Sequence, residues 1–212
     1  MADVTVLIFV VMAVAAYLLG GNNGSIIASL SLYRKDIRNY GSKNPGLTNF
    51  YRVFGKGGIP TVVLIDVLKN AVPVFIGGCL IDRVGGNALL IQAFLGFCVM
   101  LGNAYPIYYG FRGGKCVMTM GIILFFIDWR IALATWGVFF ILLLLTRCVS
   151  LSAIIGVFTY PLLIGMLGLG GVQVLCIAMA SAIFLVTRHR DNIKRLLGGT
   201  EPKITIHWPR DS

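Results

Sequence analysis

Residues suited to binding phosphate occur in four short polar segments of this chain. The first is GSKNPGLTN at 41–49, which carries four hydroxyl or amide side chains: Ser42, Asn44, Thr48 and Asn49. Glycine and proline turns let consecutive backbone N–H groups converge, and such nests bind anions. Arg52 follows three residues after Asn49, where its guanidinium fork could hold a phosphate. An ordinary solvated turn before a helix would explain the same residues.

The second segment is FRGGK at 111–115, in which Gly113 and Gly114 precede Lys115 and an apolar run follows. Glycines and a lysine before a helix N-terminus favour anions. The segment is not a Walker A motif, because Cys116 stands where that motif needs Ser or Thr. Taken alone, it is a weak signal.

The other two segments also follow apolar runs. RCVSLS at 147–152 offers Ser150 and Ser152, although a snorkelling arginine with helix-capping serines is the simpler explanation. RHRDNIKRL at 188–196 places His189 and Asn192 three residues apart, on one face of a helix. Attraction to lipid headgroups alone would explain its Arg and Lys residues.

One pair of ionisable residues, Asp66 and Lys69, lies within an apolar run with the spacing of one helix face. Such residues are functional candidates by default, and a structural ion pair is an equal alternative. The five cysteines have no CxxC spacing, so we expect no metal site, and no cofactor is indicated. Neither a Ser-His-Asp order nor the HxxxxD pattern of many glycerolipid acyltransferases occurs.

The elements that position these residues are apolar. Of 212 residues, 58% are hydrophobic and 12% charged, and this composition indicates a polytopic membrane protein. The net charge of +10 is therefore not taken as a sign of a nucleic-acid partner. We predict an all-α membrane bundle of about seven spans, with breaks at Asp128–Arg130 and at the GLGG of 168–171. The predicted apolar runs are 4–20, 59–81, 86–109, 117–127, 131–146, 149–167 and 172–187.

This division places nearly all the basic residues on one face, which the positive-inside rule makes cytoplasmic. The N-terminus is then outside and the C-terminus inside. We expect one membrane-embedded domain over 1–197 and a polar cytoplasmic tail over 198–212.

Five motifs, in order, resemble the bacterial acyl-phosphate:glycerol-3-phosphate acyltransferase family over roughly residues 16–197. The family's GSGNPGATN is GSKNPGLTN here, and its DVLKG is DVLKN. GHxYPxxxxFKGGKGVAT is matched by GNAYPIYYGFRGGKCVMT, RYVSLAS by RCVSLSA, and RHRENIxRL by RHRDNIKRL. Family members are small seven-span enzymes of the bacterial inner membrane.

The resemblance implies transfer of a fatty acyl group from acyl-phosphate to the 1-hydroxyl of glycerol 3-phosphate, an early step of phospholipid synthesis. It implies an active site at the cytoplasmic face and, as partners, membrane lipids, both substrates and the soluble enzyme that makes acyl-phosphate. Roles carry over motif by motif. Arg52, Lys115, His189 and Asn192 would hold the glycerol 3-phosphate; Ser42, Asn44, Thr48, Asn49, Gly113 and Gly114 would hold the acyl-phosphate, with Ser150 nearby. We expect Lys115, His189, Arg52 and Ser42 to be catalytic.

Three departures from the family pattern bear on activity. Asn103 stands where the family has His, and Cys116 replaces the Gly after GGK. The family's second serine falls at Ala153, so Ser152 would have to substitute for it. Two other functions remain open. Asp66, Lys69 and the glycine-rich breaks motivate a small anion transporter, and Asn103 motivates a catalytically impaired paralogue that binds lipid or acts as a scaffold.

Overall fold

The computed structural model describes residues 2–204, with side chains from Leu7 onward, and this part of the chain contains helices and no strand. The predicted all-α class is therefore confirmed. The predicted tail beyond residue 204 lies outside the described residues. The helices are α1 (Ala2–Gly20), α2 (Gly24–Tyr33), α3 (Leu47–Phe54), α4 (Ile59–Arg83), α5 (Ala88–Ala104), α6 (Val117–Ile127), α7 (Trp129–Thr146), α8 (Val149–Gly156), α9 (Thr159–Leu167), α10 (Gly171–Thr187) and α11 (Arg190–Leu197). Two 3-10 turns, η1 (Ile37–Asn39) and η2 (Ile107–Tyr109), lie between them.

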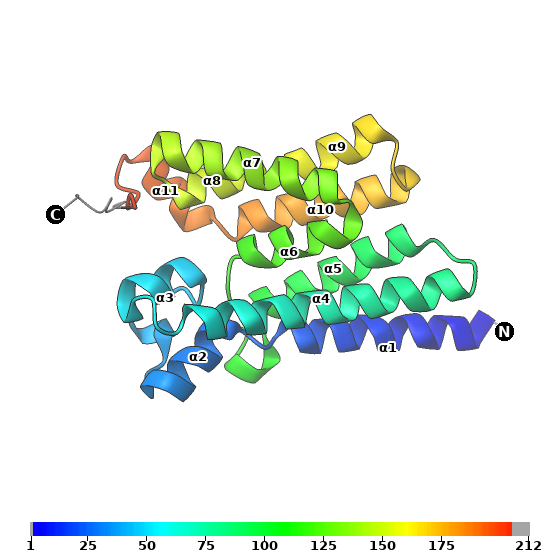
Figure 1. The fold of residues 1–212 in the computed structure, drawn as a ribbon, viewed down its shortest axis with the longest axis horizontal. Coiled ribbons are helices and arrows are strands. Elements are labelled where there is room, and N and C mark those ends of the chain that lie inside the picture. Colours follow the sequence, from blue (N-terminus) through cyan, green and yellow to red (C-terminus); the bar gives the residue numbers. More distant parts are fainter. Residues whose placement is uncertain (1, 205–212) are drawn as a thin grey trace.

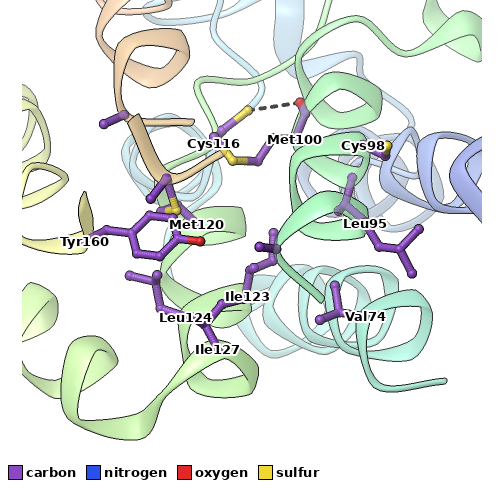
Figure 2. Packing of buried hydrophobic residues seen from close by; sticks show 14 of the residues in the cluster. Val74, Leu95, Cys98, Met100, Cys116, Met120, Ile123, Leu124, Ile127 and Tyr160 are labelled. Carbon is purple, nitrogen blue, oxygen red and sulfur yellow. Dashed lines mark hydrogen bonds between the residues drawn. The ribbon is translucent and has the colours of Figure 1, made fainter. Parts of the chain in front are cut away.

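The bundle is built around α5, which packs against α1, α4, α6 and α10 (Figure 1). The chain approaches itself most closely between α1 and α5. A methyl group on Gly102 would overlap the carbonyl of Tyr17, so only glycine lets these two helix backbones come so close. Apolar side chains fill the interior, including Val74, Leu95 and Leu124 (Figure 2).

Both predicted helix breaks are present. Asp128 caps α7 by accepting a hydrogen bond from the Arg130 backbone N–H at 2.8 Å. Its carboxylate also pairs with the guanidinium of Arg130 at 2.7 Å. Gly168 and Gly170 lie between α9 and α10 with φ of +61° and +67°, which is left-handed backbone that favours glycine. Local capping chemistry therefore determines where these helices end.

The helices that could cross a membrane are fewer than the seven predicted spans. Four described segments are long and apolar enough: Ile59–Arg83, Ala88–Tyr109, Trp129–Thr146 and Val149–Leu167. Two bent pairs, α1 with α2 and α10 with α11, raise the number to six. The remaining predicted span, 117–127, corresponds to α6, which has 11 residues, or about 16 Å of helix, against roughly 30 Å of hydrocarbon.

The basic connecting segments gather at one end of the bundle, opposite the start of α1 (Figure 1). This end carries α2, α3 and α11, together with the segments before α6 and α8. The opposite end carries the turn between α4 and α5 and the turn between α9 and α10. The fold therefore brings together polar segments that are up to about 150 residues apart in the sequence.

Candidate functional site

A cavity of about 1690 Å³ opens among the four polar segments at this end of the bundle. Its wall includes eight basic side chains and four acidic ones, so its electrostatic character favours anions. The basic residues are Arg38, Lys43, Arg52, Arg112, Lys115, Arg188, Arg190 and Arg195. Apolar residues of α6 and α7 line the remainder, so a single cavity is polar in one part and apolar in another.

The GSKNPGLTN segment forms a fixed turn at the cavity wall. Asn49 is buried; its side-chain oxygen accepts from the Ser42 N–H at 2.9 Å and its amide donates to the Tyr40 carbonyl at 3.0 Å. Asn23 donates to the Pro45 carbonyl at 3.0 Å and ties the turn to the start of α2. With its amide so engaged, Asn49 shapes the turn, a role that the sequence pattern did not indicate.

The side chains that this turn presents to the cavity are unengaged. Within residues 2–204, the side chains of Ser42, Asn44 and Thr48 make no hydrogen bond, and all three line the cavity. Arg52, in the last turn of α3, is solvent-exposed and also lines it. These groups can therefore receive an anion without breaking an existing contact.

The two glycines of FRGGK line the cavity and also close the loop. Gly113 N–H donates to the Ala104 carbonyl at 3.2 Å and Gly114 N–H to the Asn103 carbonyl at 2.9 Å. Both amides are thus used in closing the loop onto the end of α5. A methyl group on Gly113 would overlap the Asn103 carbonyl, so this residue must be glycine for the loop to pack here. Lys115 is thereby placed at the start of α6.

Lys115 belongs to a hydrogen-bonded chain that ends at a carboxylate. Its ammonium donates to the Asn192 side-chain oxygen at 2.5 Å, and the Asn192 amide donates to Glu201 at 2.6 Å. Ser150 donates to the same Glu201 oxygen at 2.7 Å, and Arg195 donates to the other at 2.7 Å. The chain links α6, α8, α11 and the segment that follows α11.

Glu201 is the one member of this hydrogen-bonded chain, apart from Arg195, that the sequence motifs did not predict as a site residue. It lies in the segment expected to be a separate polar tail, outside all five motifs. Residues 198–204 turn back over the cavity, and the Ile204 N–H donates to the Arg147 carbonyl at 2.8 Å. Burial alone would raise the pKa of Glu201, but its bonds from Asn192, Ser150 and Arg195 outweigh this and lower it.

The titration of Lys115 and His189 is set by burial. Burial is the largest cause that lowers the pKa of Lys115, and Arg195 adds repulsion. Burial likewise lowers the pKa of His189 to about 4, so its imidazole is neutral near neutral pH. Its Nδ1 lies 2.8 Å from the Leu185 carbonyl. Because a carbonyl only accepts, Nδ1 carries the proton and Nε2 keeps a free lone pair.

A buried polar network supports the FRGGK loop from beneath. Lys69 pairs with Asp66 at 2.8 Å and donates to the Asn103 side-chain oxygen at 2.7 Å. The Asn103 amide donates to the Cys116 sulfur at 3.4 Å, and that thiol donates to the Met100 carbonyl at 3.2 Å (Figure 2). Asp66 and Lys69 are therefore members of a structural network that reaches the cavity wall.

The fold brings nearly all the expected site residues together. Of these, Ser42, Asn44, Thr48, Asn49, Arg52, Asp66, Asn103, Gly113, Gly114, Lys115, Ser150, His189 and Asn192 line the one cavity. Lys69 and Ser152 are not among them. Lys69 lies beneath the wall and donates to Asn103. Ser152 is fully buried, its hydroxyl donates to the Cys148 carbonyl at 2.9 Å, and it lines a separate small cavity. Among residues 2–204, no three His, Cys, Asp or Glu side chains are grouped to hold a metal ion.

A cavity with a basic part and an apolar part, set in a bundle of apolar helices, is typical of membrane proteins whose ligands carry both an anionic group and an apolar group. Comparisons with known proteins make the class specific. The family model described as glycerol-3-phosphate acyltransferase matches residues 10–199. The chain therefore belongs to the glycerol-3-phosphate acyltransferase family, and it is a multi-pass bacterial membrane acyltransferase.

Individual relatives agree over most of their length. The glycerol-3-phosphate acyltransferase of Colwellia psychrerythraea is 39% identical, over 94% of this chain and 97% of its own. That of Staphylococcus saprophyticus is 34% identical, over 93% of this chain and 98% of its own. A crystal structure of PlsY, an integral membrane glycerol 3-phosphate acyltransferase in its glycerol 3-phosphate form, superposes with a TM-score of 0.81 at 33% identity, covering 93% of this chain and 96% of that one.

Proposed function

We propose that this enzyme transfers a fatty acyl group from an acyl-phosphate to the 1-hydroxyl of glycerol 3-phosphate. The products are 1-acylglycerol 3-phosphate and inorganic phosphate. The observation that carries the proposal is the single cavity whose basic part continues into an apolar part between α6 and α7. Two phosphates and one alkyl chain must meet for this reaction, and the cavity offers a surface for each.

The groups that contact the phosphates directly are those with free hydrogen-bond donors. Lys115 uses one of its three ammonium N–H groups on Asn192, which leaves two for a phosphate. Arg52 and the unengaged side chains of Ser42 and Thr48 face the same cavity. The first turn of α6 adds unpaired backbone N–H groups and the positive end of the helix dipole. Asn192 and Ser150, already bonded to Glu201, position Lys115 and the loop beside it.

The chemistry needs no covalent intermediate with the enzyme, because a mixed anhydride is already activated. The 1-hydroxyl attacks the acyl carbonyl carbon, the bond from that carbon to the phosphate oxygen breaks, and the hydroxyl proton leaves with the phosphate. His189 Nε2 can accept a hydrogen bond from the attacking hydroxyl and orient it, because Nδ1 is fixed on Leu185. Positive charge stabilises the departing phosphate, and fixed positions supply much of the rate.

The decisive experiment compares donors. Purified full-length chain in lipid is given glycerol 3-phosphate with either an acyl-phosphate or the acyl-coenzyme A of the same chain. Product formed only with acyl-phosphate supports the proposal. Product formed only with acyl-coenzyme A rejects acyl-phosphate as the donor. Lack of product with both, together with uptake of a phosphorylated solute into proteoliposomes, would favour the transporter alternative.

We also propose that the cavity faces the cytoplasm of a bacterial cell, at the inner membrane. Basic segments collect at the cavity end, and basic loops remain cytoplasmic. Seven crossings, with α6 as a short one, put the N-terminus outside and the C-terminus inside, where a soluble enzyme can deliver acyl-phosphate. Green fluorescent protein matures only in the cytoplasm, so a fluorescent C-terminal fusion and a dark N-terminal fusion are expected. The reverse pattern would overturn this topology.

A further inference from the structure

The apolar part of the main cavity is a groove between α6 and α7. Its wall is formed by Val117 and Met118 of α6 and by Phe139, Phe140 and Leu143 of α7. The groove begins beside Lys115, at the basic part of the cavity, and runs into the bundle. The identity of the occupant rests on the proposed function, in which the groove receives the alkyl chain of an acyl-phosphate whose phosphate lies at Lys115.

Among the α7 residues that line the groove, Trp136 lies farthest from the basic end of the cavity. Its Nε1 donates to the Gly121 carbonyl at 3.1 Å, across to α6. The ring stacks on Phe140 with centroids 5.4 Å apart and 22° between planes, and it meets Phe139 edge-on at 5.5 Å. A methyl group on Gly121 would overlap the indole, so the ring can pack this close to α6 only because residue 121 is glycine. Three contacts therefore fix the indole across the groove.

A second cavity lies directly behind this indole. It measures about 20 Å³, and Val117, Trp136 and Phe139 line both cavities, so these side chains form the wall between them. Beyond the wall the lining is mostly apolar and includes small residues, among them Gly121 and Gly156. Removing the indole would join the two cavities and lengthen the groove into the space between α6, α7, α8 and α10.

We propose that Trp136 determines which acyl-chain length this enzyme prefers, by ending the groove that receives the chain. Leu143 and Trp136 are seven positions apart on α7, which is about 10 Å of helix. A zigzag alkyl chain covers that distance with roughly eight carbons, from C–C bonds of about 1.5 Å. The carbons beyond this point are deflected past Phe140, which is half exposed, toward lipid.

The size of the effect follows from how strongly an apolar pocket discriminates by chain length. In the unmodified enzyme the indole stops the longer chains, and in Trp136→Ala their outer carbons can remain in the groove. One methylene more or less in an apolar pocket changes kcat/KM by roughly ten-fold or more, so the long chains gain relative to the unmodified enzyme until the enlarged groove is full. Medium chains, which end before the indole, gain nothing. The ratio of long-chain to medium-chain kcat/KM therefore rises.

The test measures kcat/KM of the full-length enzyme for saturated acyl-phosphates from medium to long chain. Trp136→Ala is expected to raise the long-to-medium ratio by about ten-fold or more, because the steric stop is removed, and Trp136→Phe, which keeps a ring, to change it little. Trp129→Ala is the matched control, because Trp129 begins the same helix and is 63% exposed. An unchanged ratio in active Trp136→Ala, or an equal rise in Trp129→Ala, would overturn the proposal.

Two further arms keep the test decisive. If Trp136→Ala does not fold, Trp136→Leu retains apolar volume and is expected to show a smaller rise in the same ratio; no rise would overturn the proposal. If the unmodified enzyme accepts acyl-coenzyme A instead of acyl-phosphate, the proposed donor fails while the chain-length ratio can still be measured with that donor. Failure of the donor and failure of the role of Trp136 are thus separate results.

Discussion

Replacing Lys115 by alanine tests the centre of the proposed site. The Lys115 ammonium bonds to Asn192 at 2.5 Å and keeps two donors for a substrate phosphate. Losing one charge-assisted hydrogen bond costs about 1.5–3 kcal/mol, and losing a fixed donor to developing charge costs about 2.7–4 kcal/mol. The kcat/KM of Lys115→Ala should therefore fall by about 10²–10³-fold.

The pH dependence distinguishes a role in binding phosphate from a role in packing. Burial lowers the pKa of Lys115, so the free enzyme loses this charge at a lower pH than an ordinary lysine would. The kcat/KM of the unmodified enzyme should decline on the alkaline side as the ammonium deprotonates. Lys115→Arg keeps its charge throughout, so it should lose the alkaline decline while retaining part of the activity, about ten-fold below the unmodified enzyme.

The assay follows 1-acylglycerol 3-phosphate formed by purified protein in lipid, with thermal unfolding as the check on folding. Lys56→Ala is the control, because Lys56 is an exposed lysine of the same basic end that does not line the cavity. The reasoning is refuted if folded Lys115→Ala stays within about ten-fold of the unmodified enzyme, or if Lys115→Arg keeps the alkaline decline.

Three other substitutions examine how the site is held. Gly113→Ala should cost about 1–3 kcal/mol of unfolding free energy, seen as a lower Tm, because its methyl overlaps the Asn103 carbonyl; an unchanged Tm would contradict this. Glu201→Gln removes the negative charge that raises the pKa of Lys115, so the alkaline decline of kcat/KM should move to lower pH, and a shift upward would count against it. Asn103→His combined with Cys116→Gly should recover activity that either single change loses, measured as a double-mutant cycle; additive losses would show that the two positions act independently.

The residues that gather at the cavity could be predicted because each motif holds its polar and basic side chains within a few consecutive residues. GSKNPGLTN, FRGGK and RHRDNIKRL each combine turn residues with hydroxyl, amide or basic groups, and the fold brings all three to one cavity. Glu201 could not be predicted in the same way. Its partners Ser150, Asn192 and Arg195 come from other elements, and a single acid among polar residues has no local pattern to mark it.

The helix breaks were predictable and the helix lengths were not. Asp128 and the 168–171 glycines are local signals that end a helix wherever they occur. The length of a span depends on where the helices bend, and the structure bends by 42° between α1 and α2 and by 60° between α10 and α11. Such bends cannot be predicted from the apolar runs alone.

The departures from the family pattern are best understood together. Cys116 has φ of +65°, left-handed backbone that favours glycine, so a side chain here carries strain of about 1–2 kcal/mol. Its thiol offsets part of this by donating to Met100 and accepting from Asn103. Asn103 in turn accepts from Lys69, so both departures belong to one satisfied network under the Lys115 loop. An impaired paralogue would be expected to leave that loop unsupported; here the two changes hold it in place, which favours an active enzyme.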